Sequence, residues 1–169
     1  MESSAAYVIG TRKRIQNDRP LIGDYNVNNE GSSDIYYKGA NMIHMLRQLT
    51  KDDEKWRQIL RKMNSKFYHQ TVTTQQIEDF LSKEIGRDLN PFFNQYLRDT
   101  RIPVLEYKIT EGKLNYRWNN VVSGFDMPVE ITGKQRTFWI YPRESWNAIA
   151  FVDSEIKVDI NYYVKTKQL

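Results

Sequence analysis

The sequence predicts an α+β fold, in which a helical N-terminal half is followed by a small antiparallel β-sandwich. Apolar residues recur at helical spacing from about residue 34 to about residue 100. From about residue 103 to the end they form short alternating runs separated by turn residues, which is typical of strands. This change of period predicts two domains, residues 1–102 and residues 103–169.

The composition favours an ordered chain with a packed core. Of the 169 residues, 40% are hydrophobic and 13% aromatic, and the charged residues are of both signs. A net charge of +4 is too small to indicate a nucleic-acid partner, and we expect none. We interpret the basic stretch at residues 55–66 as the solvated face of a helix.

Several kinds of site and segment are excluded by absences in the sequence. There is no cysteine, which excludes disulfides, thiolate nucleophiles and cysteine-bound zinc. No apolar run approaches the roughly 20 residues of a membrane span. These observations are compatible with both a cytoplasmic and an extracytoplasmic location, so the compartment is left open.

The first 33 residues predict the end of a helix and then a loop. Apolar residues 5–9 followed by residues 11–14, which are mostly basic, have the pattern of the C-terminal part of a helix. Residues 17–33 are rich in Asn, Asp, Gly and Pro, which favour turns. Asp34 then serves as the expected N-cap of the next helix. The stripe that this helix is expected to bury consists of Ile35, Met42, Ile43, Leu46 and Leu49.

Three more helices have recognisable ends. Asp52 lies at the start of the second, where a negative charge is favourable. Thr73 and Gln76 match a capping box at the start of the third, and Gly86 ends it. Pro91 then begins a short fourth helix.

The C-terminal half predicts a series of strands. Residues 104–109 and 114–118 flank Glu111-Gly112-Lys113 and predict a hairpin. Further strands are expected at residues 128–132, 136–141, 146–152 and 155–164. Because so short a β half can bury little surface by itself, we expect it to pack firmly against the helices.

Taken alone, the residues offer little catalytic chemistry. The two histidines, His44 and His69, are far from the spacing of a helical His-Glu-x-x-His zinc site. There is also no glycine-rich phosphate loop. We therefore expect structural or surface roles for both histidines and no metal or other cofactor bound by this chain.

Residues 36–47 carry a more specific signal. Their sequence, Tyr-Tyr-Lys-Gly-Ala-Asn-Met-Ile-His-Met-Leu-Arg, resembles the Tyr-x-Lys-Gly-Ala segment of aminopeptidase N-like zinc metallopeptidases. Later segments resemble the same family in the same order: residues 71–80, 86–97, 102–105 and 158–164. The resemblance extends over about residues 5–169 and implies that residues 158–164 form the closing strand of the sandwich.

The resemblance implies a fold and a site. Residues 1–102 would be the downstream part of a thermolysin-like peptidase domain of the gluzincin type. Tyr36 would be the catalytic tyrosine, whose hydroxyl helps zinc to stabilise the oxyanion of the scissile carbonyl. Tyr37 falls on the variable position of the motif. Lys38 and Gly39 are interpreted as structural, with Gly39 allowing a neighbouring element to come close.

The family's zinc-binding motifs and its Gly-x-Met-Glu-Asn substrate loop are not found in the chain, and we expect them upstream of residue 1. The expected function is therefore that of a fragment of a zinc-dependent aminopeptidase, which removes N-terminal residues from peptides. Its partners would be the upstream part of the same polypeptide and, in the complete enzyme, zinc and a peptide substrate. The chain alone is expected to be inactive.

The alternative is a non-catalytic protein-binding module with a peptidase-derived fold. It predicts an exposed apolar or aromatic patch with a polar rim. The fragment interpretation predicts in particular that Tyr36 is partly exposed while Met42, Leu46 and Leu49 pack inside. The alternative for Tyr36 is an ordinary core tyrosine.

Overall fold

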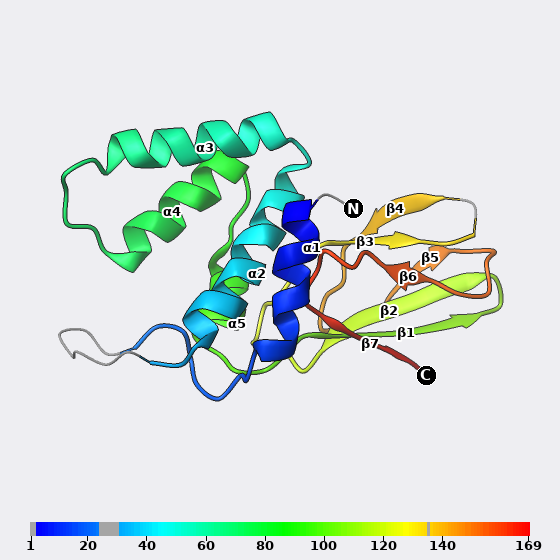
Figure 1. Cartoon of the computed structure of the whole chain (residues 1–169). Helices are drawn as coiled ribbons and strands as arrows, with labels where there is room; N and C mark the ends of the chain where they lie inside the picture. The colour runs from blue at the N-terminus through cyan, green and yellow to red at the C-terminus, as the bar shows by residue number, and fades with distance from the viewer. Residues whose placement is uncertain (1–2, 24–30, 135) are drawn as a thin grey trace.

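The computed structural model of the chain describes residues 3–23, 31–134 and 136–169. Helices gather at one side of the molecule and strands at the other, with α1 (Ser3–Gly10) and α2 (Asp34–Thr50) nearest to the strands (Figure 1). The expected α+β class and its order, helices first and strands second, are confirmed.

The first helix is followed directly by a short 3₁₀ helix, Thr11–Arg14. A side chain of this helix makes hydrogen bonds to both halves of the molecule. The guanidinium of Arg12 donates to Asn41 Oδ1 on α2 at 2.6 Å. It also donates to the carbonyl oxygens of Ile160 and Asn161, at 2.7 and 3.0 Å. One side chain thus joins the N-terminal helix to α2 and to the end of the β half.

The remaining helices begin where their sequence signals predict, and one of them also ends at the predicted glycine. They are α3 (Asp53–Lys66), α4 (Thr74–Ile85) and α5 (Asn90–Leu97). The Asp52 side chain accepts a hydrogen bond from the Lys55 amide, which caps α3. Thr73 and Gln76 form the expected capping box, and Gly86 ends α4 with a left-handed φ of 84°.

The expected N-cap of α2 is wrong. The N-cap position is occupied by Ser33, and Asp34 is the first helical residue. Its carboxylate is turned inward, where it accepts the backbone amides of Gln16 at 2.8 Å and Asn17 at 2.6 Å. The carboxylate therefore caps a distant segment of the chain instead of its own helix.

The buried stripe of α2 is also displaced from its expected position. Met42 and Leu46 are buried as expected and Leu49 is partly buried, but Ile35 and Ile43 are each 41% exposed. The buried side of the helix includes polar residues, among them Asp34, Lys38 and Asn41. Hydrophobic spacing alone misplaced the face because it assumes that polar residues lie outside.

The β half contains two sheets. The first has the order β5-β2-β1-β7, and it contains the expected hairpin of β1 (Val104–Thr110) and β2 (Lys113–Asn119). Its outer strands are β5 (Asn147–Ala150) and β7 (Lys165–Gln168). The second has the order β4-β3-β6 and consists of β3 (Val129–Thr132), β4 (Thr137–Ile140) and β6 (Lys157–Val158).

Two expectations about these sheets are wrong. The first sheet is mixed, because β7 pairs parallel with β1. The expected strand at residues 155–164 is also interrupted after β6, since the Asp159 side chain accepts from the Asn161 amide and bends the chain. The bend carries the chain from the second sheet to the first, so residues 158–164 are not one closing strand.

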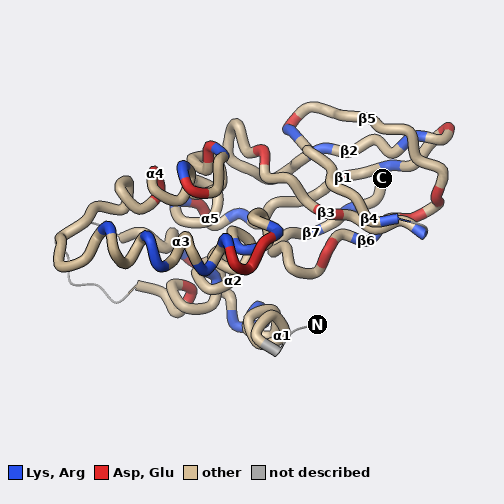
Figure 2. The backbone as a smooth tube through the Cα atoms, turned by 90° about the horizontal axis from the view of Figure 1, so that it is seen from above, with Lys and Arg blue, Asp and Glu red and all other residues tan. Residues whose placement is uncertain are grey.

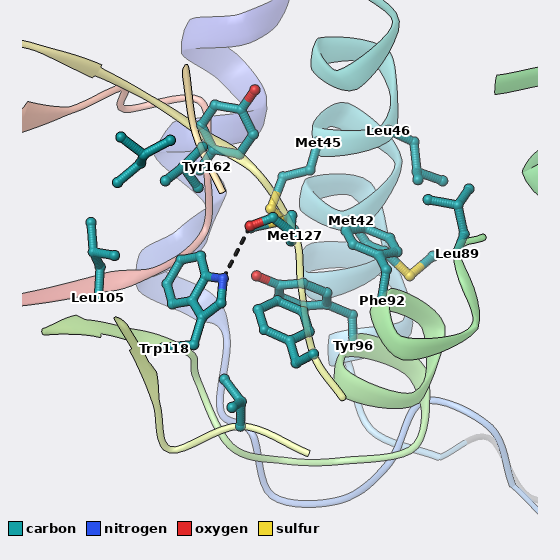
Figure 3. Packing of buried hydrophobic residues seen from close by; sticks show 14 of the residues in the cluster. Met42, Met45, Leu46, Leu89, Phe92, Tyr96, Leu105, Trp118, Met127 and Tyr162 are labelled. Atoms are coloured by element: carbon teal, nitrogen blue, oxygen red, sulfur yellow. Dashed lines mark hydrogen bonds between the residues drawn. The ribbon is translucent and has the colours of Figure 1, made fainter. Parts of the chain in front are cut away.

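One hydrophobic core joins the helices to both sheets. Trp118 lies in it almost completely buried, with its indole N–H donating to the Met127 carbonyl at 3.0 Å (Figure 3). Tyr96 of α5 donates its hydroxyl to the Tyr163 carbonyl at 3.0 Å. The expected firm contact between the halves is confirmed, whereas their division into two domains stays a prediction.

Charges of both signs are distributed over the two halves (Figure 2). Two basic residues of α3 form ion pairs, Arg57 with Glu54 and Lys62 with Glu84. Within the described ranges, no helix is long and apolar enough to cross a membrane.

Candidate functional site

Tyr36 lies in the first turn of α2, and its side chain is 71% exposed. Its backbone amide donates to the Ser33 carbonyl at 3.1 Å, so the residue is part of the regular turn that begins the helix. The predicted exposure of Tyr36 is confirmed. Its catalytic role stays a prediction.

An apolar groove of about 510 Å³ borders Tyr36. One wall consists of Leu21 and Ile22, and α2 and α5 form the others. The amides of Leu21 and Ile22 both donate to the Leu97 carbonyl at the end of α5, at 2.8 and 3.2 Å. This wall is therefore held in place by backbone hydrogen bonds to a helix of the core.

Gly39 lies in this groove, and the structural role expected for it stays a prediction. A Cβ atom at this position would meet nothing closer than the Asp34 carbonyl oxygen, at 4.0 Å. Among the described residues, no other element comes close to the helix at this position. The missing side chain instead adds room to the groove next to Tyr36.

A second hollow, of about 310 Å³, continues the apolar surface toward α4. The two hollows share Met42, Ile43 and Leu97. Polar groups border the second hollow, including Thr73 and the Glu78 carboxylate, which is paired with Arg98. The surface thus has an apolar centre and a polar edge.

The inner side of the first turn of α2 is charged and buried. Asp34 is 0% exposed and Lys38 is 1% exposed. The Lys38 ammonium donates to the Asp99 carbonyl at 2.8 Å. Burial lowers the pKa of Lys38, against the opposing fields of the Asp34 and Asp99 carboxylates. Sequence reasoning missed this burial, although Asp34 and Lys38 are separated by one helical turn from which a shared face could have been inferred.

The histidines have the structural surroundings expected of them. His44 is buried, with Nε2 at 2.9 Å from Asn161 Oδ1. The His69 ring packs edge-on against Tyr68. In the part of the chain that the structure describes, no group of three or more His, Cys, Asp or Glu side chains could hold a metal ion. These residues therefore do not fit a zinc site.

No protein-family model matches the sequence, and no curated protein matches it. Among solved structures, the fold is similar to that of Legionella pneumophila aminopeptidase A, crystallised in complex with aspartic acid. The TM-score is 0.65 and the sequence identity 14%, and the match covers 97% of this chain but 23% of that one. The chain therefore shares its fold with about a quarter of the length of that aminopeptidase.

Proposed function

We propose that the chain is the downstream part of an aminopeptidase N-like zinc metallopeptidase. Residues 1–102 would complete a thermolysin-like catalytic domain, and residues 103–169 would form its β-sandwich. The observation that carries the proposal is Tyr36, a motif tyrosine at the exposed start of a helix that is otherwise anchored in the core. The fold shared with part of an aminopeptidase supports it.

In this proposal the chain contributes a hydrogen-bond donor. The Tyr36 hydroxyl would donate to the carbonyl oxygen of a peptide substrate as negative charge develops on it. Such a donor accelerates the reaction because it is already in place when the charge forms. Since the described residues do not fit a zinc site, the proposal assigns the metal and the general base to an upstream part of the same polypeptide.

The test is Tyr36→Phe in the complete polypeptide. Loss of one oxyanion donor lowers kcat by about 10²–10³-fold, or roughly 3–4 kcal/mol. The melting temperature is expected to stay the same, because the side chain is 71% exposed. Tyr68, also 71% exposed but in the turn after α3, provides the matched control Tyr68→Phe, which is expected to leave kcat unchanged. Normal turnover by Tyr36→Phe would remove the catalytic assignment.

The isolated chain is expected to be inactive. Aminoacyl p-nitroanilides, assayed with and without added zinc, are expected to show no release of nitroaniline above the background rate. Turnover by the 169-residue chain would contradict this expectation, and so would tight one-to-one zinc binding measured by elemental analysis.

A second candidate function is favoured by the apolar groove. A non-catalytic protein-binding module needs an exposed apolar surface with a polar edge, and the two connected hollows beside α2 have this character. The coding sequence upstream of residue 1 discriminates the two functions. A His-Glu-x-x-His motif in frame favours the peptidase, and its absence favours the binding module.

A further inference from the structure

Tyr36 has buried charged residues on either side of it in sequence. Asp34 and Lys38 are each two residues away, which places them about 200° around the helix from Tyr36. Accordingly, both are buried while Tyr36 is 71% exposed. Because little of the Tyr36 side chain is packed, its position depends on how the backbone of this turn is held.

Asp34 holds the turn on one side. Its two carboxylate oxygens accept separate backbone amides, from Gln16 at 2.8 Å and from Asn17 at 2.6 Å. Hydrogen bonds to a charged acceptor are shorter and stronger than neutral ones. Asn17 in turn donates its side-chain amide to the Tyr163 hydroxyl at 3.0 Å, which connects this anchor to the β half.

Lys38 holds the turn on another side. Its ammonium donates to the Asp99 carbonyl at 2.8 Å, in the segment between α5 and β1. That segment is itself fixed, because the Asp99 carboxylate accepts the Arg101 amide at 2.7 Å and pairs with the Arg101 guanidinium. The start of α2 is thus connected to the boundary between the two halves.

Burying these charged side chains carries a desolvation cost, so helix stability alone does not explain them. The Lys38 ammonium donates to a neutral carbonyl oxygen, and burial lowers the pKa of this group. Apolar side chains of similar volume often serve stability equally well at buried charged positions. Buried polar groups whose hydrogen bonds are satisfied make a structure more rigid and specify one arrangement, which limits rotation and sliding of the helix end.

We propose that Asp34 and Lys38 are positioning residues, which hold the first turn of α2 so that the Tyr36 hydroxyl keeps one place and direction. The proposal rests on the function proposed above for Tyr36. It assigns to these two buried side chains a role in kcat that acts through Tyr36 and involves no contact with substrate.

The first experiment uses the 169-residue chain and needs no activity. Amide hydrogen exchange of residues 36–39 is compared with that of Phe93, whose amide donates to the Leu89 carbonyl in α5. Asp34→Asn and Lys38→Met are expected to speed exchange at residues 36–39 by about tenfold through local opening, and to leave Phe93 unchanged. The control is Lys62→Met, a largely exposed lysine of α3. Equal acceleration at Phe93, or no acceleration at residues 36–39, would overturn the positioning role.

The second experiment is a double-mutant cycle in the complete enzyme. Asp34→Asn is expected to lower kcat by about tenfold while KM stays within about twofold, and to have no further effect once Tyr36→Phe is present. An equal loss in both backgrounds would overturn the claim that Asp34 acts through Tyr36. Normal turnover by Tyr36→Phe alone would instead refute the proposed function, and the exchange result would still decide whether Asp34 and Lys38 hold the turn. Lys38→Met provides the same cycle if Asp34→Asn fails to fold.

Discussion

At the scale of single residues, a buried carboxylate on β1 accepts hydrogen bonds from two side chains of β2. Glu106 on β1 is 3% exposed and accepts two hydrogen bonds from Arg117 and one from Asn119, all at 2.7–2.9 Å. The hydrogen bonds from Asn119 and Arg117 lower the pKa of the Glu106 carboxyl. A charge on the inner part of a strand could not be anticipated from alternation of apolar and polar residues.

This lowered pKa predicts how stability changes with pH. The stabilisation from Glu106 is complete above the ordinary glutamate pKa of about 4.3 and is lost as pH falls through the lower folded-state pKa. Glu106→Gln is therefore expected to be less stable than the parent chain at pH 7, with the difference in the free energy of unfolding narrowing below about pH 4. Urea unfolding of both proteins at several pH values measures this difference in the free energy of unfolding.

A matched control is Glu111→Gln, at the exposed β1–β2 turn. Its effect on stability is expected to be small. A Glu106→Gln difference that stays constant down to pH 2 would contradict the linkage to the carboxyl.

At the scale of secondary-structure elements, local signals decide where helices end. Gly86 follows α4 with a φ of 84°, and its amide donates to the Ser82 carbonyl at 2.9 Å. This conformation is easy for glycine but costs residues with a Cβ atom roughly 1–2 kcal/mol. The helix end was predictable because the signal lies within a few residues of it.

Gly86→Ala is expected to destabilise the chain by about 1–2 kcal/mol. Gly10→Ala is the control, because Gly10 has a φ of −61° and a Cβ atom there would meet nothing within 4 Å. That control is expected to be neutral or stabilising by up to about 1 kcal/mol. Thermal and urea unfolding of both variants measure the contrast, and equal effects would show that the left-handed conformation is not the cause.

At the scale of the whole molecule, the helices and both sheets share one core around Trp118 (Figure 3). Its indole ring packs edge-on against Phe125, which also contacts Tyr96 of α5. A change at Trp118 therefore affects both halves.

Trp118→Ala is expected to cost about 3–5 kcal/mol and to lower the stability of both halves together. Far-ultraviolet circular dichroism, which follows the helices, and near-ultraviolet signals from the aromatic core are expected to change in one coincident transition. Trp146, 41% exposed, is the control, and Trp146→Ala is expected to cost at most about 1 kcal/mol. Loss of the β half at a lower temperature than the helices would show two independent domains.

The sequence by itself determined the features that depend on neighbours along the chain. The capping box at Thr73, the glycine end of α4 and the β1–β2 hairpin follow from residues a few positions apart. The change from helical to strand spacing was also visible, because each period is a local property. The motif that begins at Tyr36 could be recognised in the same way.

Only the tertiary structure decided which groups are brought together from distant parts of the chain. It turned Asp34 toward residues 16–17, buried Lys38 against Asp99, and left Ile35 and Ile43 exposed along the groove. The tertiary structure also places a bend at Asp159. After this bend the C-terminal residues join the first sheet as β7, parallel to β1. The physical reason is the same in each case: a side chain is buried when distant groups can satisfy its hydrogen bonds and fill the space around it, and spacing along one element does not contain those partners.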